Sequence, residues 1–336
     1  MPISVPRRRL TLAGAASLGL AACAGWQSHA PERGPIAAMF PGRVDDGGIM
    51  EAGYGGLLRI RDELGIPVQH VDQVTADEKR MREALRELAG SDAKMVIAYG
   101  GEAAEAVQRV AWEFPEQRFT SVQGSLLRPN LAVYAVRLEQ STWLAGATAG
   151  LLTRSDVVGH VCGLRDSSAL KARAAFAAGL AHTNPKAKLL TSFTGAEDDP
   201  EAAKRVTLAE IDAGADVIHT TLGAGRAGAI EASRERGVKL IGNVARWVPS
   251  MADIFVAGAV ADPGVAVFQS GRDLYDNLWK GDVTKRFGVR NPDAVGIAFA
   301  PSVAEAVRSR ITVAAQELAA GSIKIPEEYR GPEFLS

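Results

Sequence analysis

The stretch ADVIHTTLGAGRAG, residues 215–228, decides the fold. Its first half is a short, mostly apolar run, which is the pattern of a β-strand buried on both faces of a sheet. Three glycines follow with the spacing GxGxxG, at Gly223, Gly225 and Gly228, where a helical segment begins. A strand, a glycine turn and a helix in succession predict one βα unit of a parallel sheet.

The same alternation extends in both directions along the chain. Short apolar runs predict eleven strands, at 36–40, 67–71, 94–98, 118–122, 131–136, 157–162, 187–192, 215–220, 238–242, 254–258 and 294–299. Amphipathic segments predict helices at 49–64, 76–88, 103–112 and 202–211, and Gly65 and Gly90 are expected to cap the first two. Eleven strands exceed one open sheet, and 336 residues correspond to roughly two domains of about 150 residues. The sequence therefore predicts two α/β lobes, each with a doubly wound parallel sheet.

Ligands of such sheets bind beyond the carboxyl ends of the strands. Here the segments that follow the predicted strands are rich in glycine, as at Gly42, at Gly100 and Gly101, and at Gly223 and Gly225. Glycine allows tight turns and a close approach of the backbone to a ligand. We therefore expect a binding site built from these turns.

Composition and motifs exclude several other classes of function. The chain has 38 Lys and Arg residues against 39 Asp and Glu residues, so it has no excess of positive charge for nucleic acid. Two cysteines, Cys23 and Cys162, cannot form a four-ligand zinc site, and the five histidines lack metal-binding spacing, so no metal is expected. His160 and His219 lie inside predicted strands, and we interpret them as core residues.

The GxGxxG motif by itself suggests a dinucleotide. Such a site also needs an acidic residue about 20 positions further on, after the next strand. The chain has Gly242, Asn243 and Val244 there instead. We therefore expect no cofactor and no enzymatic activity. An exported NAD-dependent α/β enzyme remains an alternative.

The first 23 residues have the features of an export signal. Three arginines at 7–9 precede an uncharged segment at 10–22, which at 1.5 Å per residue is about 20 Å long and too short to cross a bilayer. The segment ends in Leu-Ala-Ala-Cys, which resembles a lipobox with Cys23 as the lipidated residue, and the paired arginines resemble a twin-arginine signal. The sequence predicts a signal peptide at 1–23, a tether at 24–34 and a membrane-anchored lipoprotein in the periplasm or another extracytoplasmic compartment.

The order of landmarks in the body resembles the basic membrane protein family, the substrate-binding lipoproteins of ABC importers that mostly bind purine nucleosides. The resemblance covers about residues 36–325. It is carried by Asp45-Asp46 with Gly53, Tyr54 and Gly56; Gly100-Gly101 with Phe114-Pro115 and Phe119; Thr142-Trp143-Leu144-Ala145-Gly146; Gly159, Gly163, Phe176 and Gly179; Gly195 with Asp199-Pro200; Gly214 to Ile218; Ile241-Gly242; and Lys280-Gly281.

This resemblance implies a type I periplasmic binding protein fold, with two doubly wound lobes and a three-crossing hinge. Lobe 1 is expected at 35–139 plus 262–292, and lobe 2 at 140–261 plus 293–336. The crossings are expected near 138–142, 245–262 and 290–300. A ligand is held as the lobes close around it.

The expected contacts depart from the nucleoside pattern of the family. Ile49 and Met50 stand where an aromatic residue and asparagine are usual, Glu197 replaces the second stacking aromatic, and Val244 replaces the ribose-binding aspartate. Trp143 and Trp247 are candidate replacements, each either a ligand contact or hinge packing. The expected ligand-binding residues are Asp45, Asp46, Met50, Gly100, Gly101, Gln123, Trp143, Glu197, Gly223, Gly225, Asn243 and Trp247.

The resemblance thus predicts a monomeric receptor that binds a small polar or heterocyclic molecule, such as a nucleoside or nucleobase, and delivers it to an ABC permease in the inner membrane. A receptor of the same fold that signals to a membrane partner is the second interpretation.

Overall fold

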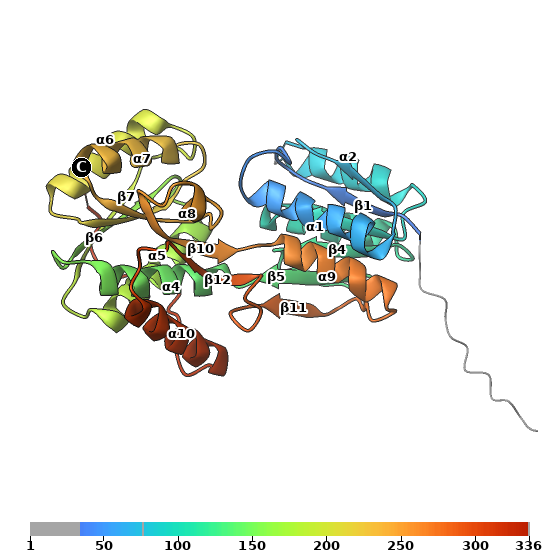
Figure 1. Ribbon diagram of the computed structural model, residues 1–336. Coiled ribbons are helices and arrows are strands. Elements are labelled where there is room, and N and C mark those ends of the chain that lie inside the picture. Colours follow the sequence, from blue (N-terminus) through green and yellow to red (C-terminus); the bar gives the residue numbers. More distant parts are fainter. Residues whose placement is uncertain (1–33, 76, 335–336) are drawn as a thin grey trace, which may run out of the picture. The chain divides into compact units, whose positions relative to one another are not determined.

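The computed structural model describes residues 34–75 and 77–334, which form two six-stranded sheets (Figure 1). Sheet A has the order β11-β5-β4-β3-β1-β2, and all of its strands are parallel. Its strands are β1 (Ile36–Met39), β2 (Val68–Val71), β3 (Met95–Tyr99), β4 (Arg118–Val122), β5 (Leu131–Val136) and β11 (Thr284–Phe287). Its helices are α1 (Ile49–Leu64), α2 (Glu78–Ala89), the 3₁₀ turn η1 (Gly101–Ala103), α3 (Ala104–Glu113) and α9 (Gly264–Tyr275).

Sheet B has the order β12-β10-β9-β8-β6-β7, and only β12 runs antiparallel to its neighbour. Its strands are β6 (Val157–Cys162), β7 (Lys188–Phe193), β8 (Val217–Thr221), β9 (Lys239–Gly242), β10 (Phe255–Ala261) and β12 (Val295–Phe299). Its helices are α4 (Leu138–Leu152), α5 (Ser167–Thr183), α6 (Pro200–Asp212), α7 (Arg226–Arg236), α8 (Trp247–Ser250) and α10 (Glu305–Ala320).

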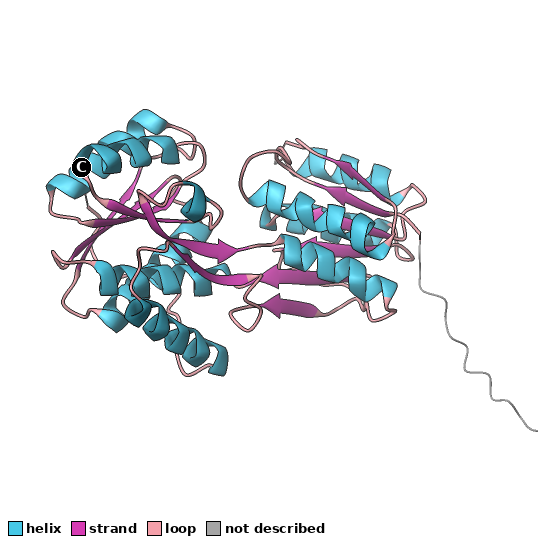
Figure 2. Ribbon diagram, viewed as in Figure 1, coloured by secondary structure: helices cyan, strands magenta, loops and turns pink. Residues whose placement is uncertain are grey.

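Helices cover both faces of each sheet (Figure 2). Apolar side chains of α1 and α9 pack on one face of sheet A, and those of α2 and α3 pack on the other. In sheet B, α6, α7 and α8 cover one face, and α4 and α5 cover the other. A sheet covered on both faces must bury almost every residue of its strands, which explains why the runs are continuously apolar.

The predicted elements are largely confirmed, since all eleven apolar runs are strands and the four predicted helices are present as α1, α2, α3 and α6. Gly65 caps α1 with a φ of 67°, as expected, whereas Gly90 has a φ of −80° and ends α2 without a left-handed turn. Strand β11, with the sequence Thr-Lys-Arg-Phe, was not predicted. Its charged residues interrupt the apolar pattern by which the other strands were predicted, and an edge strand tolerates them because part of its surface stays in water.

Both sheets repeat one strand order that places a crevice at the same point. The first strand of each lobe, β1 or β6, lies between the second and third strands of that lobe. The connections on its two sides therefore lead to opposite faces, which opens a crevice beyond the carboxyl ends of β1 and β3 in sheet A, and of β6 and β8 in sheet B. The chain passes between the sheets three times, after β5, after β10 and after β11.

The C-terminal segment pairs with the outer strand of sheet B. The Phe334 amide donates to the Thr191 carbonyl at 2.8 Å, so the tail covers part of the free edge of β7. Cys23, the predicted signal peptide and most of the predicted tether lie outside the described residues. None of the helices within residues 34–75 and 77–334 is long and apolar enough to span a membrane.

Candidate ligand site

The loop after β1 is closed by its own aspartate. The Asp46 carboxylate accepts hydrogen bonds from the amides of Gly48 at 2.7 Å, Met50 at 3.2 Å and Glu51 at 3.1 Å. It therefore satisfies the first free amides of α1 and adds a negative charge at the positive end of the helix. Asp45 forms an exposed ion pair with Arg43 at 2.9 Å. Its role as a ligand contact stays a prediction.

Tyr99, at the carboxyl end of β3, holds the first turn of α1 through a hydrogen bond. Its side chain is 1% exposed, and its hydroxyl donates to the carbonyl of Ile49. Gly53 makes this contact possible, because a Cβ at that position would lie 2.2 Å from the Tyr99 ring. Burial raises the pKa of the Tyr99 hydroxyl, which keeps it a neutral donor. Sequence reasoning assigned no role to Tyr99, which follows directly after the apolar run predicted at 94–98.

The neighbouring loops of sheet A contain three further expected site residues. Gly100 has a φ of 93°, which favours glycine, and Gly101 is exposed at the start of η1. The Gln123 side chain accepts from the Val136 amide at 2.7 Å and donates to the Val136 carbonyl at 3.4 Å, so it ties β4 to β5. The amide group of Gln123 is therefore engaged within the protein, and its role as a ligand contact stays a prediction. Met50 is half-buried and packs against the core of sheet A.

At the crevice of sheet B, Glu197 bonds to the loops that follow two neighbouring strands. Its carboxylate accepts from the Leu164 amide at 2.9 Å, after β6, and from the Gly223 amide at 3.3 Å, after β8. The Glu197 carbonyl also accepts from the Gly225 amide at 3.0 Å. Glu197 is thus a bridge between loops, and the amides of Gly223 and Gly225 that were expected to bind a ligand are already paired.

The GxGxxG motif is explained by packing. A Cβ at Gly228 would lie 1.8 Å from the Pro200 carbonyl oxygen, and a Cβ at Gly225 would lie 2.7 Å from the Glu197 carbonyl oxygen. The two glycines therefore let α7 approach α6 and the preceding loop. This local reason accounts for the motif without a dinucleotide, in agreement with the missing acidic residue after β9.

The two tryptophans proposed as stacking residues lie in different surroundings. Trp143 is 1% exposed and packs in a core cluster between α4, α5 and α10, which is the packing alternative of the sequence analysis. Trp247 is half-buried at the start of α8, with the Arg226 guanidinium 4.3 Å from its ring centre and Phe255 at its edge. Asn243, between β9 and Trp247, has no hydrogen-bonded side-chain partner among the described residues.

Two arginines that sequence reasoning missed stand at this edge. Arg226, the first residue of α7, is 8% exposed. Arg246 is exposed and donates to Glu51 at 2.7 Å, which joins the loop after β9 to the start of α1 in the other lobe. The Glu51 pairing lowers the pKa of Glu51 and raises that of Arg246. The motif itself contained a signal for Arg226, since the cation stands between its last two glycines.

His160 and His219 are fully buried in sheet B, as predicted. His219 stacks on Phe176 with 4.8 Å between ring centres and bonds to the Ile241 carbonyl through Nδ1 at 2.9 Å. Burial lowers the pKa of both histidines, that of His219 to about 4, so both rings are neutral. Burial raises the pKa of the Cys162 thiol to about 12, which keeps it unreactive.

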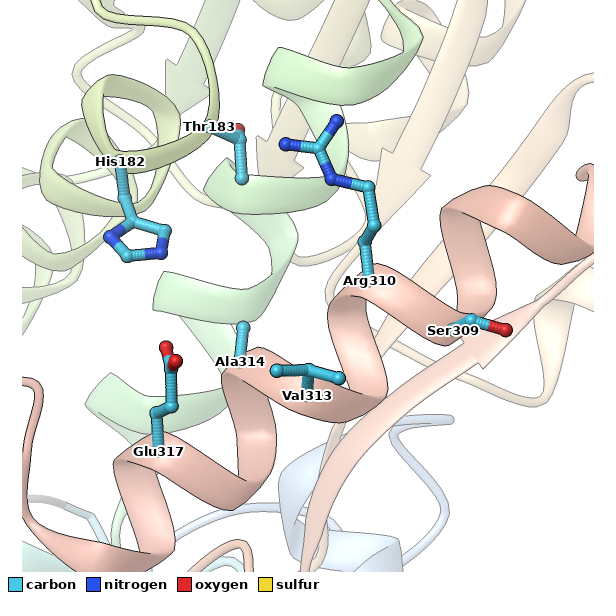
Figure 3. A pocket seen from close by; sticks show the side chains of 7 residues that line it. All are labelled: His182, Thr183, Ser309, Arg310, Val313, Ala314 and Glu317. Carbon is cyan, nitrogen blue, oxygen red and sulfur yellow. The ribbon is translucent and has the colours of Figure 1, made fainter.

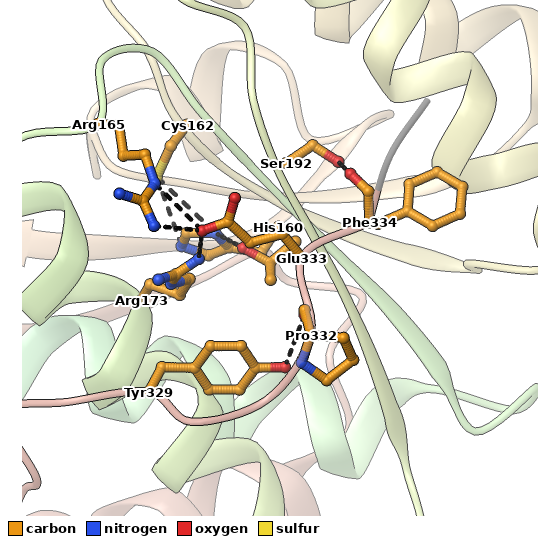
Figure 4. A network of polar contacts seen from close by, with 10 residues as sticks. His160, Cys162, Arg165, Arg173, Ser192, Tyr329, Pro332, Glu333 and Phe334 are labelled. Carbon is orange, nitrogen blue, oxygen red and sulfur yellow. Dashed lines mark hydrogen bonds and ion pairs between the residues drawn. The ribbon is translucent and has the colours of Figure 1, made fainter.

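Beside these rings, the C-terminal tail adds a polar network (Figure 4). Glu333 lies between Arg165 and Arg173 and accepts from them at 2.9 Å and 2.7 Å. The Ser192 hydroxyl donates to the Phe334 carbonyl at 3.2 Å. These contacts anchor the tail to the lobe and pair the Glu333 carboxylate with two arginines, of which Arg165 belongs to the loop after β6.

Two surface hollows lie elsewhere on the second lobe. One lies between α5 and α10 and is lined by His182, Thr183, Ser309, Arg310, Val313, Ala314 and Glu317 (Figure 3). The other lies between α5 and the tail segment 326–330. Neither contains a residue of the loops at the crevices, and the described residues hold no cluster of His, Cys, Asp and Glu suited to a metal.

The sequence matches the family described as "Bmp: ABC transporter substrate-binding protein PnrA-like" over residues 35–328. It is 24% identical over 225 residues to Basic membrane protein A of Borreliella burgdorferi, and covers 66% of that protein and of this chain. It therefore spans slightly less than two thirds of that relative. It is 23% identical to the CD4+ T-cell-stimulating antigen of Listeria monocytogenes over 319 residues, with 86% of that protein and 85% of this chain covered, and 22% identical to the Transcriptional activator protein med of Bacillus subtilis over 209 residues, with 65% and 62% covered.

Solved structures share the fold at low sequence identity. An ABC transporter solute-binding protein from Conexibacter woesei superposes with a TM-score of 0.74 at 23% identity, covering 98% of that chain and 87% of this one. The periplasmic binding protein of an arabinose ABC transporter from Shewanella gives 0.61 at 15% identity, covering 98% and 86%. The predicted periplasmic binding protein fold with two parallel-sheet lobes is confirmed.

Proposed function

Because the chain belongs to the Bmp family of ABC transporter substrate-binding proteins, we propose that it captures a small polar or heterocyclic molecule between its two lobes and hands it to an importer. The binding surface consists of the loops after β1 and β3 in one lobe and after β8 and β9 in the other. Among the expected residues, Asp46, Met50, Gly100, Gly101, Asn243 and Trp247 belong to this surface, together with Arg226 and Arg246. The protein acts by binding and release, without a chemical step.

The observation that carries this proposal is the contact of Arg246 with Glu51. It joins a loop at the carboxyl edge of sheet B to a loop at the carboxyl edge of sheet A, at 2.7 Å. Both loops stand where ligands of doubly wound sheets bind. A molecule held there touches both lobes, so its binding favours the closed arrangement that a permease distinguishes from the empty one.

Loading and release of small molecules test this proposal. The purified chain is incubated with a metabolite extract, washed and denatured, and the released compounds are identified by mass spectrometry. We expect Trp247→Leu to lose the bound compound and Trp112→Leu to keep it. Trp112 is a matched control, because Arg128 lies 4.3 Å from its ring centre, as Arg226 does from Trp247, but it belongs to the exposed side of α3. A chain that takes up no compound contradicts the proposal.

The delivery partner and the anchor form a second part of the proposal. Lipidation of Cys23 after export, by the twin-arginine route, would hold the receptor beside a permease outside the cytoplasm. Labelling cells with a radioactive fatty acid tests the anchor: the wild-type chain is expected to carry label and to sediment with membranes, and Cys23→Ser to do neither. Labelled Cys23→Ser would contradict the assignment.

A signalling receptor is the second candidate, supported by the similarity to a relative whose name describes a transcriptional activator. The two roles differ in what happens to the ligand. Deletion of the gene abolishes uptake of the identified compound if the protein serves an importer. Unchanged uptake together with an altered transcriptional response to that compound favours the signalling role.

A further inference from the structure

Arg226 is a buried cation without a carboxylate partner. It is 8% exposed, its guanidinium lies over the Trp247 ring at 4.3 Å, and its one hydrogen bond, to the Leu222 carbonyl, is long at 3.4 Å. No carboxylate of the described residues lies within ion-pair distance of it. A guanidinium that has lost most of its contact with water is stabilised when an anion pairs with it. None of the Arg226 guanidinium nitrogens is among the fully buried, unpaired atoms of the described residues, so the donors that do not bond to Leu222 are open to solvent or to an occupant of the crevice.

The acidic residues around Arg226 are all used elsewhere. Asp46 is bonded to three amides of its own loop, and Asp198 accepts from the Ala224 amide at 2.6 Å. Glu197 bridges the loops after β6 and β8, and Glu51 pairs with Arg246. Burial and the nearby positive charge of Arg246 lower the pKa of Arg226, while Asp46 and Asp198 raise it. The described residues therefore supply no anion that pairs with Arg226 at the carboxyl edge of sheet B.

Its place in the fold points to a ligand as the source of that anion. Arg226 opens α7 after the turn 222–225 that follows β8, so it stands at the crevice of sheet B, where the positive end of the helix adds to its charge. Trp247 holds the guanidinium plane from one side, which limits its motion and keeps its fork of donors together. Arg246 supplies a second cation from the loop after β9.

We propose that the ligand carries an oxyanion, a carboxylate or a phosphate, and that Arg226 is the residue that binds it. This inference rests on the proposed function and narrows it, since a neutral nucleoside leaves the buried guanidinium unpaired. A planar guanidinium donates two parallel hydrogen bonds to either oxyanion, and such charge-assisted pairs are among the strongest contacts in proteins. Arg226 is then a specificity residue that rejects uncharged analogues.

Two matched pairs of probes test the inference by isothermal titration of the full chain. Adenosine is compared with adenosine 5′-monophosphate, and uracil with orotate, so that each pair differs only by a phosphate or a carboxylate. We expect the charged member of at least one pair to bind about tenfold more tightly or better, which the usual strength of a charge-assisted hydrogen bond supports. The pair that responds tells which oxyanion the site takes.

Variants assign this preference to Arg226. Arg226→Gln is expected to remove it and Arg226→Lys to keep part of it, because lysine keeps the charge but not the planar fork. Arg128→Gln is the control, since Arg128 lies over Trp112 at the same 4.3 Å on a different part of the molecule, and it is expected to keep the full preference. Circular dichroism and melting curves check that each variant is folded.

Equal binding of charged and neutral members, or a preference that survives in folded Arg226→Gln, overturns the inference while leaving the proposed function intact. If none of the four probes binds, the charge of the compound recovered from the metabolite extract tests the inference. An anionic compound lost from Arg226→Gln supports the inference, and a neutral or cationic one overturns it. A wild-type chain that takes up no compound overturns the proposed function and the inference together.

Discussion

Each lobe buries one carboxylate in its interior, and the two are held differently. In the lobe of sheet A, Asp273 is 3% exposed, accepts from the Tyr134 hydroxyl at 2.6 Å and pairs with Lys285. In the lobe of sheet B, Glu210 is fully buried and one of its carboxyl oxygens lies 2.7 Å from the Ser192 hydroxyl, but no cation of the described residues pairs with it. One lobe pairs its buried charge, and the other does not.

The difference shows that the presence of a counter-ion decides the state of a buried acid. Burial without a cation raises the pKa of Glu210 to about 8, so near neutral pH it is mostly protonated and uncharged. His160 and His219, which are also buried in this lobe, are neutral for the same reason. Asp273 has Lys285 to balance its charge. The same strand order thus supports one interior with a paired charge and one with neutral polar groups.

The largest expected effect comes from breaking the paired site. Asp273→Asn removes the charged partner of Lys285, whose side chain is 39% exposed, and weakens the bond to Tyr134, so we expect the free energy of unfolding to fall by about 2 kcal/mol. Urea unfolding followed by circular dichroism measures it. Glu210→Gln is the matched change in the other lobe, and it is expected to leave stability at pH 7 unchanged or higher. Equal losses in both variants would contradict the comparison.

The second effect is a pH dependence that belongs to Glu210. A buried carboxyl with a pKa of about 8 keeps a proton that the unfolded chain, with a value of 4.5, has lost, so stability falls as pH rises between these values. His219 acts in the opposite direction below pH 6.5, because the unfolded chain then takes up a proton that the buried ring does not. Glu210 therefore dominates between pH 6.5 and about 8.

In that interval we expect the free energy of unfolding to decrease with a slope approaching about 1.4 kcal/mol per pH unit. Urea unfolding at several pH values measures the slope, and Glu210→Gln is expected to flatten it. Asp273→Asn serves as the control that lowers stability without removing the slope. A slope that persists in Glu210→Gln would show that another group carries it.

A smaller effect is expected from the two carboxylates that close the loops at the crevices. Glu197→Ala leaves the amides of Leu164 and Gly223 without their acceptor, and we expect a loss of about 1 kcal/mol. Asp46→Ala removes the cap of α1 and is expected to cost a similar amount. Hydrogen exchange of the two loops separates the variants, since each is expected to increase exchange only in its own lobe.

The smallest effect is expected at the ion pair between the lobes. Glu51 and Arg246 are both substantially exposed, so Glu51→Gln is expected to change stability by about 0.5 kcal/mol or less. Added salt is expected to weaken the pair further. Melting temperatures at low and high ionic strength measure this. A loss comparable to that of Asp273→Asn would mean that the pair is shielded from water, contrary to its exposure.

Most of the fold could be predicted from local patterns. Strands buried on both faces appear as continuous apolar runs, and helices between them keep a period that the sequence displays, so eleven strands and the boundaries of α1 were correct. Strand β11 was missed because its two central residues, Lys285 and Arg286, carry charges. Lys285 meets its partner Asp273 only after the chain has folded, and no local pattern shows that contact.

The sequence could place candidate site residues at the ends of predicted strands, but it could not show which contacts their side chains make. The sequence by itself determined that glycine turns follow the strands, because the need for tight turns and close helix packing selects glycine at fixed positions. Only the tertiary structure decided which donors stay free. The Glu197 carboxylate accepts from the amide of Gly223, 26 residues further along the chain. Trp143 is buried in a core cluster between helices, and Arg226 has no carboxylate within ion-pair distance among the described residues. These outcomes depend on distances between segments far apart in the chain, and hydrogen bonds and charges are satisfied by whatever lies within a few ångströms in space.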